Sequence, residues 1–71
     1  MTLPEALSFM GIKLPTTLNN LDTMYRTLIK QYHPDRNQGR LQWSHEMTLR
    51  LNEAYALIRE TLSSGLSGEV E

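Results

Sequence analysis

The chain contains no cysteine, which excludes both a disulfide framework and a metal site built on thiolates. Aromatic residues are few: one Trp, three Tyr and one Phe occur among 71 residues. No apolar run approaches the 18 or so residues that a membrane span needs, and the first residues lack the basic and apolar pattern of a secretory signal. We therefore expect a soluble, cytoplasmic protein that is stabilised by helix packing and has no membrane partner.

Neither sign of charge is in large excess, because the chain has seven Lys and Arg and eight Asp and Glu, which give a net charge of −1. A general nucleic-acid binder is normally strongly basic, so the composition argues against that class but leaves room for a local basic face. The hydrophobic fraction of 39% suffices for one modest core. Domains of this length usually reach a stability of only about 3–5 kcal/mol.

A short first helix is predicted between Thr2 and Gly11. Thr2 is a suitable N-cap, Pro4 suits the first turn, and Glu5 complements the positive end of the helix dipole. Apolar residues then share one face at helical spacing: Leu3, Ala6, Leu7 and Met10. Gly11 is expected in the left-handed conformation that ends many helices, with Ile12 folding back onto the last turn.

A second, longer helix is predicted from Leu18 to Tyr32. Its apolar positions are Leu18, Leu21, Met24, Tyr25, Leu28, Ile29 and Tyr32. Three residues before or within its first turn are acceptable N-caps, and the sequence does not choose among them: Thr16, Thr17 and Asn19. The opposite face carries Asp22, Arg26 and Lys30, for which we expect an Asp22–Arg26 ion pair.

A third helix is predicted after a loop from Asp35 to about Gln42, with Ser44 as its N-cap. Its apolar stripe consists of Met47, Leu51, Ala54, Tyr55, Ile58 and Leu62. Glu46 and Arg50 stand at the spacing of an exposed ion pair. We place one helical domain at residues 1–62 and a flexible tail at residues 63–71.

These patterns predict an all-α fold, since no segment alternates with the period of a strand. The two longer helices must lie antiparallel to bury their stripes on each other. The short first helix then packs across this hairpin.

The segment between the longer helices contains the most constrained tripeptide of the chain. Pro34 moves His33 out of the helical region and itself lacks an amide donor, so the second helix must stop there. Asp35 follows in the loop. The simplest interpretation is that His33 caps helix carbonyls while Asp35 accepts from loop amides.

Two chemical interpretations of this tripeptide are disfavoured. A carboxylate orients the histidine of a hydrolytic triad, but no strand-turn-helix elbow supplies a serine nucleophile. His33, Asp35 and His45 do not match any helical metal-ligand spacing. We expect no catalytic residue, no metal site and no cofactor.

Cations gather around the same loop: Arg26, Lys30, Arg36 and Arg40. Such residues are most often only a solvated face. A basic patch next to an exposed histidine also suits an acidic protein partner, whose association it accelerates electrostatically. Trp43 either shields the loop or forms part of a contact site. A small helical DNA-binding domain is a further alternative, but a helix-turn-helix needs a turn of about 3–4 residues where this chain has a long loop.

Four ordered motifs resemble the J-domain of the DnaJ co-chaperones over residues 5 to about 60. The closest resemblance is the loop Tyr32-His33-Pro34-Asp35-Arg36-Asn37-Gln38-Gly39. Upstream stand Met10-Gly11-Ile12 and Tyr25-Arg26 with Leu28, and downstream stands Leu51-Asn52-Glu53-Ala54-Tyr55 with Ile58. The run typical of the family's fourth helix is missing, as are its Gly/Phe-rich, zinc-binding and client-binding regions.

The resemblance implies a co-chaperone, not an enzyme. Its partner would be a DnaK-type, seventy-kilodalton chaperone whose ATP hydrolysis it stimulates, with a further protein or segment supplying the client. The residues implied in chaperone binding are Tyr25, Arg26, Lys30, His33, Pro34, Asp35, Arg36 and Asn37.

The chain departs from the family at Asp22, Thr27 and Gln31, where Lys or Arg is common. The thinner basic face implies weaker or more selective docking. It also leaves open an alternative, a degenerate J-like module that binds or tethers a chaperone without stimulating it.

Overall fold

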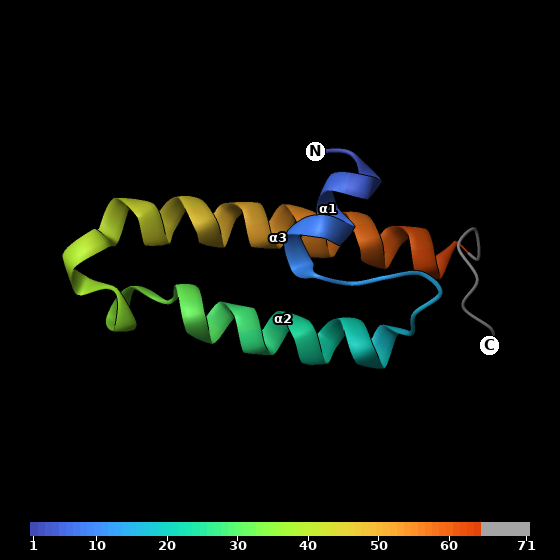
Figure 1. Cartoon of the computed structure of the whole chain (residues 1–71), viewed down its shortest axis with the longest axis horizontal. Coiled ribbons are helices and arrows are strands. Elements are labelled where there is room, and N and C mark those ends of the chain that lie inside the picture. Colours follow the sequence, from blue (N-terminus) through green and yellow to red (C-terminus); the bar gives the residue numbers. More distant parts are fainter. Residues whose placement is uncertain (65–71) are drawn as a thin grey trace.

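A computed structural model of the chain describes residues 1–64, which contain three α-helices and two short 3₁₀ turns (Figure 1). The helices are α1 (Leu3–Met10), α2 (Leu18–Tyr32) and α3 (Leu41–Ser63), and the turns are η1 (Pro34–Arg36) and η2 (Gln38–Arg40). No strand occurs within residues 1–64. The all-α prediction is confirmed, and the predicted limits of α2 agree with the structure residue for residue.

Both ends of α1 have the predicted caps. The Thr2 hydroxyl accepts from the Glu5 amide, while the Glu5 carboxylate accepts from the Thr2 amide at 2.8 Å, and this hydrogen bond lowers the pKa of Glu5. At the other end Gly11 has φ 69° and ψ 32°. The Ile12 amide donates back to the Leu7 carbonyl at 2.9 Å, and the Ile12 side chain is buried.

The structure selects Thr17 as the N-cap of α2. Its hydroxyl accepts from the Asn20 amide at 3.1 Å. Thr16 is buried instead, and its hydroxyl accepts from the Asn20 side chain at 2.8 Å. One asparagine thus joins both threonines to the first turn of α2.

The predicted start of α3 was wrong, because the helix begins at Leu41 and Ser44 lies inside it. Ser44 is fully buried, and its hydroxyl donates to the Tyr32 carbonyl at the end of α2. Inside the helix, the amides after Ser44 already bond to backbone carbonyls and need no side-chain cap. The predicted loop from Asp35 to Gln42 is accordingly shorter and mostly folded into η1 and η2.

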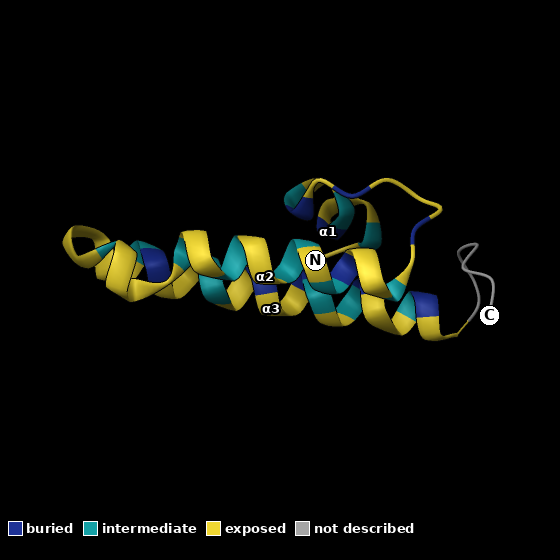
Figure 2. Ribbon diagram, turned by 90° about the horizontal axis from the view of Figure 1, so that it is seen from below, coloured by how far each residue is buried: buried dark blue, intermediate teal, exposed yellow. Residues whose placement is uncertain are grey.

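The two long helices form an antiparallel hairpin, as predicted, and α1 lies on one side of it (Figures 1 and 2). The short helix contacts α3 far more than α2. The buried hydrophobic residues are Ala6, Met10, Ile12, Leu21, Leu51, Ala54, Ile58 and Leu62. Only one of these residues belongs to α2, whose other apolar side chains are half-buried against this core.

Neither predicted helical ion pair forms within residues 1–64. Asp22 does not pair with Arg26, nor Glu46 with Arg50. The Asp22 carboxylate accepts instead from the Tyr55 hydroxyl across the hairpin, at 2.7 Å. The half-buried Tyr55 on α3 is therefore the partner of Asp22 in place of Arg26, which stands one turn away on α2. An ion pair at that helical spacing contributes only about 0.3–0.5 kcal/mol.

Ser63, the first residue of the predicted tail, is the last residue of α3. The remainder of the tail, and the expectation that no fourth helix follows, concern residues 65–71, which lie outside the described part of the chain. Among residues 1–64, no helix combines the length and hydrophobicity required to cross a membrane.

We predict that Ser44→Ala lowers the free energy of unfolding by about 1–3 kcal/mol, because it leaves the Tyr32 carbonyl without its donor next to a fully buried position. The control is Ser63→Ala, an exposed position in the last turn of the same helix. Urea unfolding of both variants, followed by circular dichroism, tests this. Equal stability of the two variants would contradict it.

Candidate functional site

The loop after α2 presents His33, Pro34 and Asp35 at one end of the hairpin. His33 has φ −62° and ψ 139°, the extended conformation that a following proline imposes. Pro34 then begins η1. All three residues are exposed. The tripeptide is therefore an ordered turn at the end of α2 and not a continuation of the helix.

The last carbonyls of α2 would lack donors because this turn interrupts the helical hydrogen bonds. Pro34 has no amide hydrogen, and the amides of Asp35 and Arg36 bond to His33 instead. Side chains replace the missing donors. The Asn37 amide group donates to the carbonyls of Gln31 and His33, each at 2.9 Å.

Ser44 completes this arrangement by donating to the Tyr32 carbonyl. Three consecutive carbonyls, from Gln31 to His33, therefore accept from two side chains that come after the tripeptide. Asn37 is also joined to η2, because its carbonyl accepts from the Arg40 amide at 2.8 Å and its side-chain oxygen from the Arg40 guanidinium at 3.3 Å. We call the Asn37 and Ser44 contacts with these carbonyls the carbonyl clamp.

Within the turn, the Asp35 amide donates to Nδ1 of His33 at 3.2 Å. Because Nδ1 accepts, the neutral imidazole carries its proton on Nε2. The Asp35 carboxylate lies 3.7 Å from the same nitrogen, and the two side chains are 53% and 88% exposed. A partner can thus reach an imidazole donor and a carboxylate acceptor side by side.

A basic face follows α2 up to this loop. Arg26, Lys30 and Arg36 are exposed, and no carboxylate of residues 1–64 forms an ion pair with them. Together with Thr23, Thr27 and Gln31, they line an open hollow of about 460 Å³. A second hollow of about 360 Å³ shares Lys30 and Arg36 with the first and extends to Ile29, His33 and Asp35. The face and the tripeptide are therefore continuous.

Tyr25 belongs to a network that joins α2 to α3. Its hydroxyl donates to the Asn52 side chain at 2.7 Å, and its ring lies 4.5 Å from that of Tyr55, centroid to centroid. Tyr55 in turn donates to Asp22 at 2.7 Å. This hydrogen bond to a carboxylate raises the pKa of the Tyr55 phenol. The network fixes the register of the two long helices next to the basic face.

Aromatic contacts brace the base of the loop. The Tyr32 ring meets Trp43 edge-on at 5.6 Å and lies 6.1 Å from Phe9 of α1. The guanidinium of Arg40 stacks over Trp43 at 4.1 Å. Trp43 therefore packs against the loop, and Arg40 lies over its ring.

Two contacts of this candidate site were not predicted from the sequence. Ser44 was expected to be a cap, although its spacing of seven residues from Leu51 and fourteen from Ile58 continues the apolar stripe of α3. That spacing was the signal for a buried position. The partnership of Asp22 with Tyr55 had no local signal, because 33 residues separate them.

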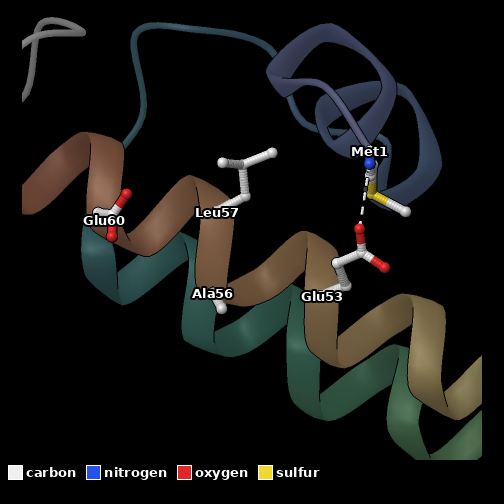
Figure 3. A pocket seen from close by; sticks show the side chains of 5 residues that line it. All are labelled: Met1, Glu53, Ala56, Leu57 and Glu60. Carbon is white, nitrogen blue, oxygen red and sulfur yellow. Dashed lines mark hydrogen bonds and ion pairs between the residues drawn. The ribbon is translucent and has the colours of Figure 1, made fainter.

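A further hollow of about 270 Å³ lies between the start of the chain and α3, away from the loop (Figure 3). It is lined by Met1, Glu53, Ala56, Leu57 and Glu60, and the Met1 amino group lies 3.1 Å from the Glu53 carboxylate. Within residues 1–64, His, Asp and Glu side chains form no group of three that is suited to hold a metal ion. The exposed polar groups of the loop remain the candidate functional site.

A comparison with solved structures finds no match for this chain. A comparison with protein families matches residues 6–63 to the DnaJ domain. This match includes α2, the clamped loop and α3 in full, and α1 from Ala6 onward. J-domains are co-chaperone modules that generally interact with seventy-kilodalton chaperones, and they are not a family of catalytic enzymes. Over most of its length, the chain thus belongs to the DnaJ-domain family.

Proposed function

We propose that this protein docks α2 and the His33–Asp35 turn onto a DnaK-type chaperone and stimulates its ATP hydrolysis. The observation that carries the proposal is the clamped turn: His33 and Asp35 are exposed, while the backbone behind them is tied to Asn37 and Ser44. A turn held in this way enters a complex with little further loss of conformational entropy.

The basic face supplies the attraction that brings the partners together. Arg26, Lys30 and Arg36 form no ion pairs in residues 1–64, so their full charge is available to an acidic surface. Charges of this kind raise the association rate and orient the encounter more than they add to the final affinity. The turn would then contact a site on the chaperone that is coupled to its nucleotide pocket.

The residues of the proposed site divide by what their side chains contact. Five have exposed side chains that are free to meet a partner: Arg26, Lys30, His33, Asp35 and Arg36. Pro34, Tyr25 and Asn37 act chiefly on the shape of the surface. Pro34 fixes the turn, the Tyr25 hydroxyl bonds to Asn52, and the Asn37 amide bonds to the end of α2.

In this proposal the ATP and its catalytic groups belong to the chaperone, so this chain is not an enzyme and needs no cofactor. A client would be delivered by another segment or another protein. A DNA-binding role finds no support in the geometry, because α2 and α3 lie antiparallel and not at the steep angle of a helix-turn-helix (Figure 1).

Binding without stimulation is the second candidate function. It is favoured by the uneven charge of α2, where Thr27 and Gln31 are neutral and Asp22 is acidic. Under this alternative, the protein binds or tethers the chaperone and leaves its turnover unchanged. Measuring binding and turnover on the same samples separates the two.

We predict that His33→Gln abolishes stimulation, because it removes the imidazole that both accepts from the Asp35 amide and faces the partner. The measurement is single-turnover ATP hydrolysis by the chaperone of the source organism. The matched control is His45→Gln, which changes the other histidine of the chain, an exposed residue on α3. This variant should stimulate as the wild type does.

The proposal fails if wild type and His33→Gln stimulate equally or if neither does. Wild-type binding that leaves turnover unchanged selects the tethering alternative.

We further predict that the double variant Arg26→Ala/Lys30→Ala weakens binding roughly tenfold, since each exposed charge contributes up to about 1 kcal/mol. The loss should appear mainly in the association rate and shrink as salt is added, because ions screen exposed charges. Stopped-flow association at several salt concentrations measures this.

Lys13→Ala/Arg50→Ala removes two exposed cations that lie outside the basic face and serves as the charge-matched control. If this control weakens binding as much as Arg26→Ala/Lys30→Ala, net charge and not the basic face governs docking.

A further inference from the structure

Asp22 is the acidic residue on α2, and it stands one and two turns before Arg26 and Lys30. About 12 Å of helix separates it from Lys30. This distance exceeds the screening length of about 8 Å at physiological ionic strength. The two ends of α2 therefore act on different parts of any partner surface.

The structure keeps the Asp22 charge from cancelling its cationic neighbour. An aspartate four residues before an arginine is well placed for a helical ion pair. Here the carboxylate accepts from the Tyr55 hydroxyl at 2.7 Å and forms no ion pair within residues 1–64. Neither the Asp22 carboxylate nor the Arg26 guanidinium therefore takes part in an ion pair within residues 1–64.

Tyr55 is itself held in place. Its ring lies 4.5 Å from that of Tyr25, whose hydroxyl is bonded to Asn52. The Asp22 carboxylate is thus fixed at the border between α2 and α3 by a series of contacts from both helices. A carboxylate fixed in this way presents its charge at one position. It therefore discriminates between partner surfaces better than a mobile carboxylate does.

We propose that Asp22, one turn before the basic face on α2 and oriented by Tyr55, is a specificity residue for docking. It selects a chaperone that places a Lys or Arg opposite the start of α2 and carboxylates opposite Arg26, Lys30 and Arg36. A chaperone that is acidic along its whole docking surface is repelled at Asp22. This inference rests on the proposed function, because it names which DnaK-type chaperone the same face accepts.

The test compares Asp22→Lys with Glu46→Lys for binding to two DnaK-type chaperones, that of the source organism and one from an unrelated organism. Both substitutions change the net charge by the same amount, and Glu46 is exposed on α3. Binding is measured by calorimetry with the chaperone in its ATP-bound form.

With the chaperone of the source organism, Asp22→Lys should bind about five- to tenfold more weakly than Glu46→Lys, because an attraction worth a factor of up to about five becomes a repulsion. With the unrelated chaperone this loss should be smaller or reversed. If Asp22→Lys binds the first chaperone as tightly as Glu46→Lys, the inference is overturned while the proposed function stands. If the wild type binds neither chaperone, the proposed function itself is overturned.

The orienting role of Tyr55 has a separate test. Tyr55→Phe removes the hydroxyl and leaves the ring against Tyr25. Its effect on binding should depend on Asp22, so that Tyr55→Phe weakens binding in the wild-type background but not in Asp22→Asn. A purely structural role predicts the same loss in both backgrounds, and that outcome would contradict the assignment.

Discussion

The hydrogen bonds that the end of α2 receives from Asn37 and Ser44 are the interaction on which the site depends. Pro34 stops the helix by removing a donor and a permissible conformation at once. A helix interrupted so abruptly leaves carbonyls that must find other partners. Asn37 serves Gln31 and His33, and Ser44 serves Tyr32. The helix stop at Pro34 exposes the tripeptide and also leaves the carbonyls to which Asn37 and Ser44 must donate.

In this arrangement, the side chains that face solvent differ from the side chains that hold the backbone of the turn in place. Lys30, His33 and Asp35 are exposed next to one hollow, whereas Ser44 is buried and bonds to the end of α2. The Tyr25–Tyr55 contact aligns α2 with α3, so the basic face keeps a fixed relation to the turn. A small core supports this division, because only one residue of α2 needs to be fully buried.

Local patterns predicted the helices well, as the limits of α2 and both caps of α1 demonstrate. These features depend on neighbours within one turn, which a sequence displays directly. The errors arose where a side chain chose a distant partner. Ser44 was expected to cap its own helix and instead bonds to Tyr32, and Asp22 was expected to pair with Arg26 and instead accepts from Tyr55. Local propensity does not reveal such choices, since the competing partner comes from another helix.

We propose that the clamp holds the turn in the conformation that stimulates the chaperone. The most direct measurement is single-turnover ATP hydrolysis by the cognate chaperone at a saturating concentration of the Asn37→Asp variant. This substitution preserves size but replaces two donors by a carboxylate facing the carbonyls of Gln31 and His33. The account predicts a folded protein that still binds and has lost most of its stimulation. Full stimulation by Asn37→Asp would contradict it.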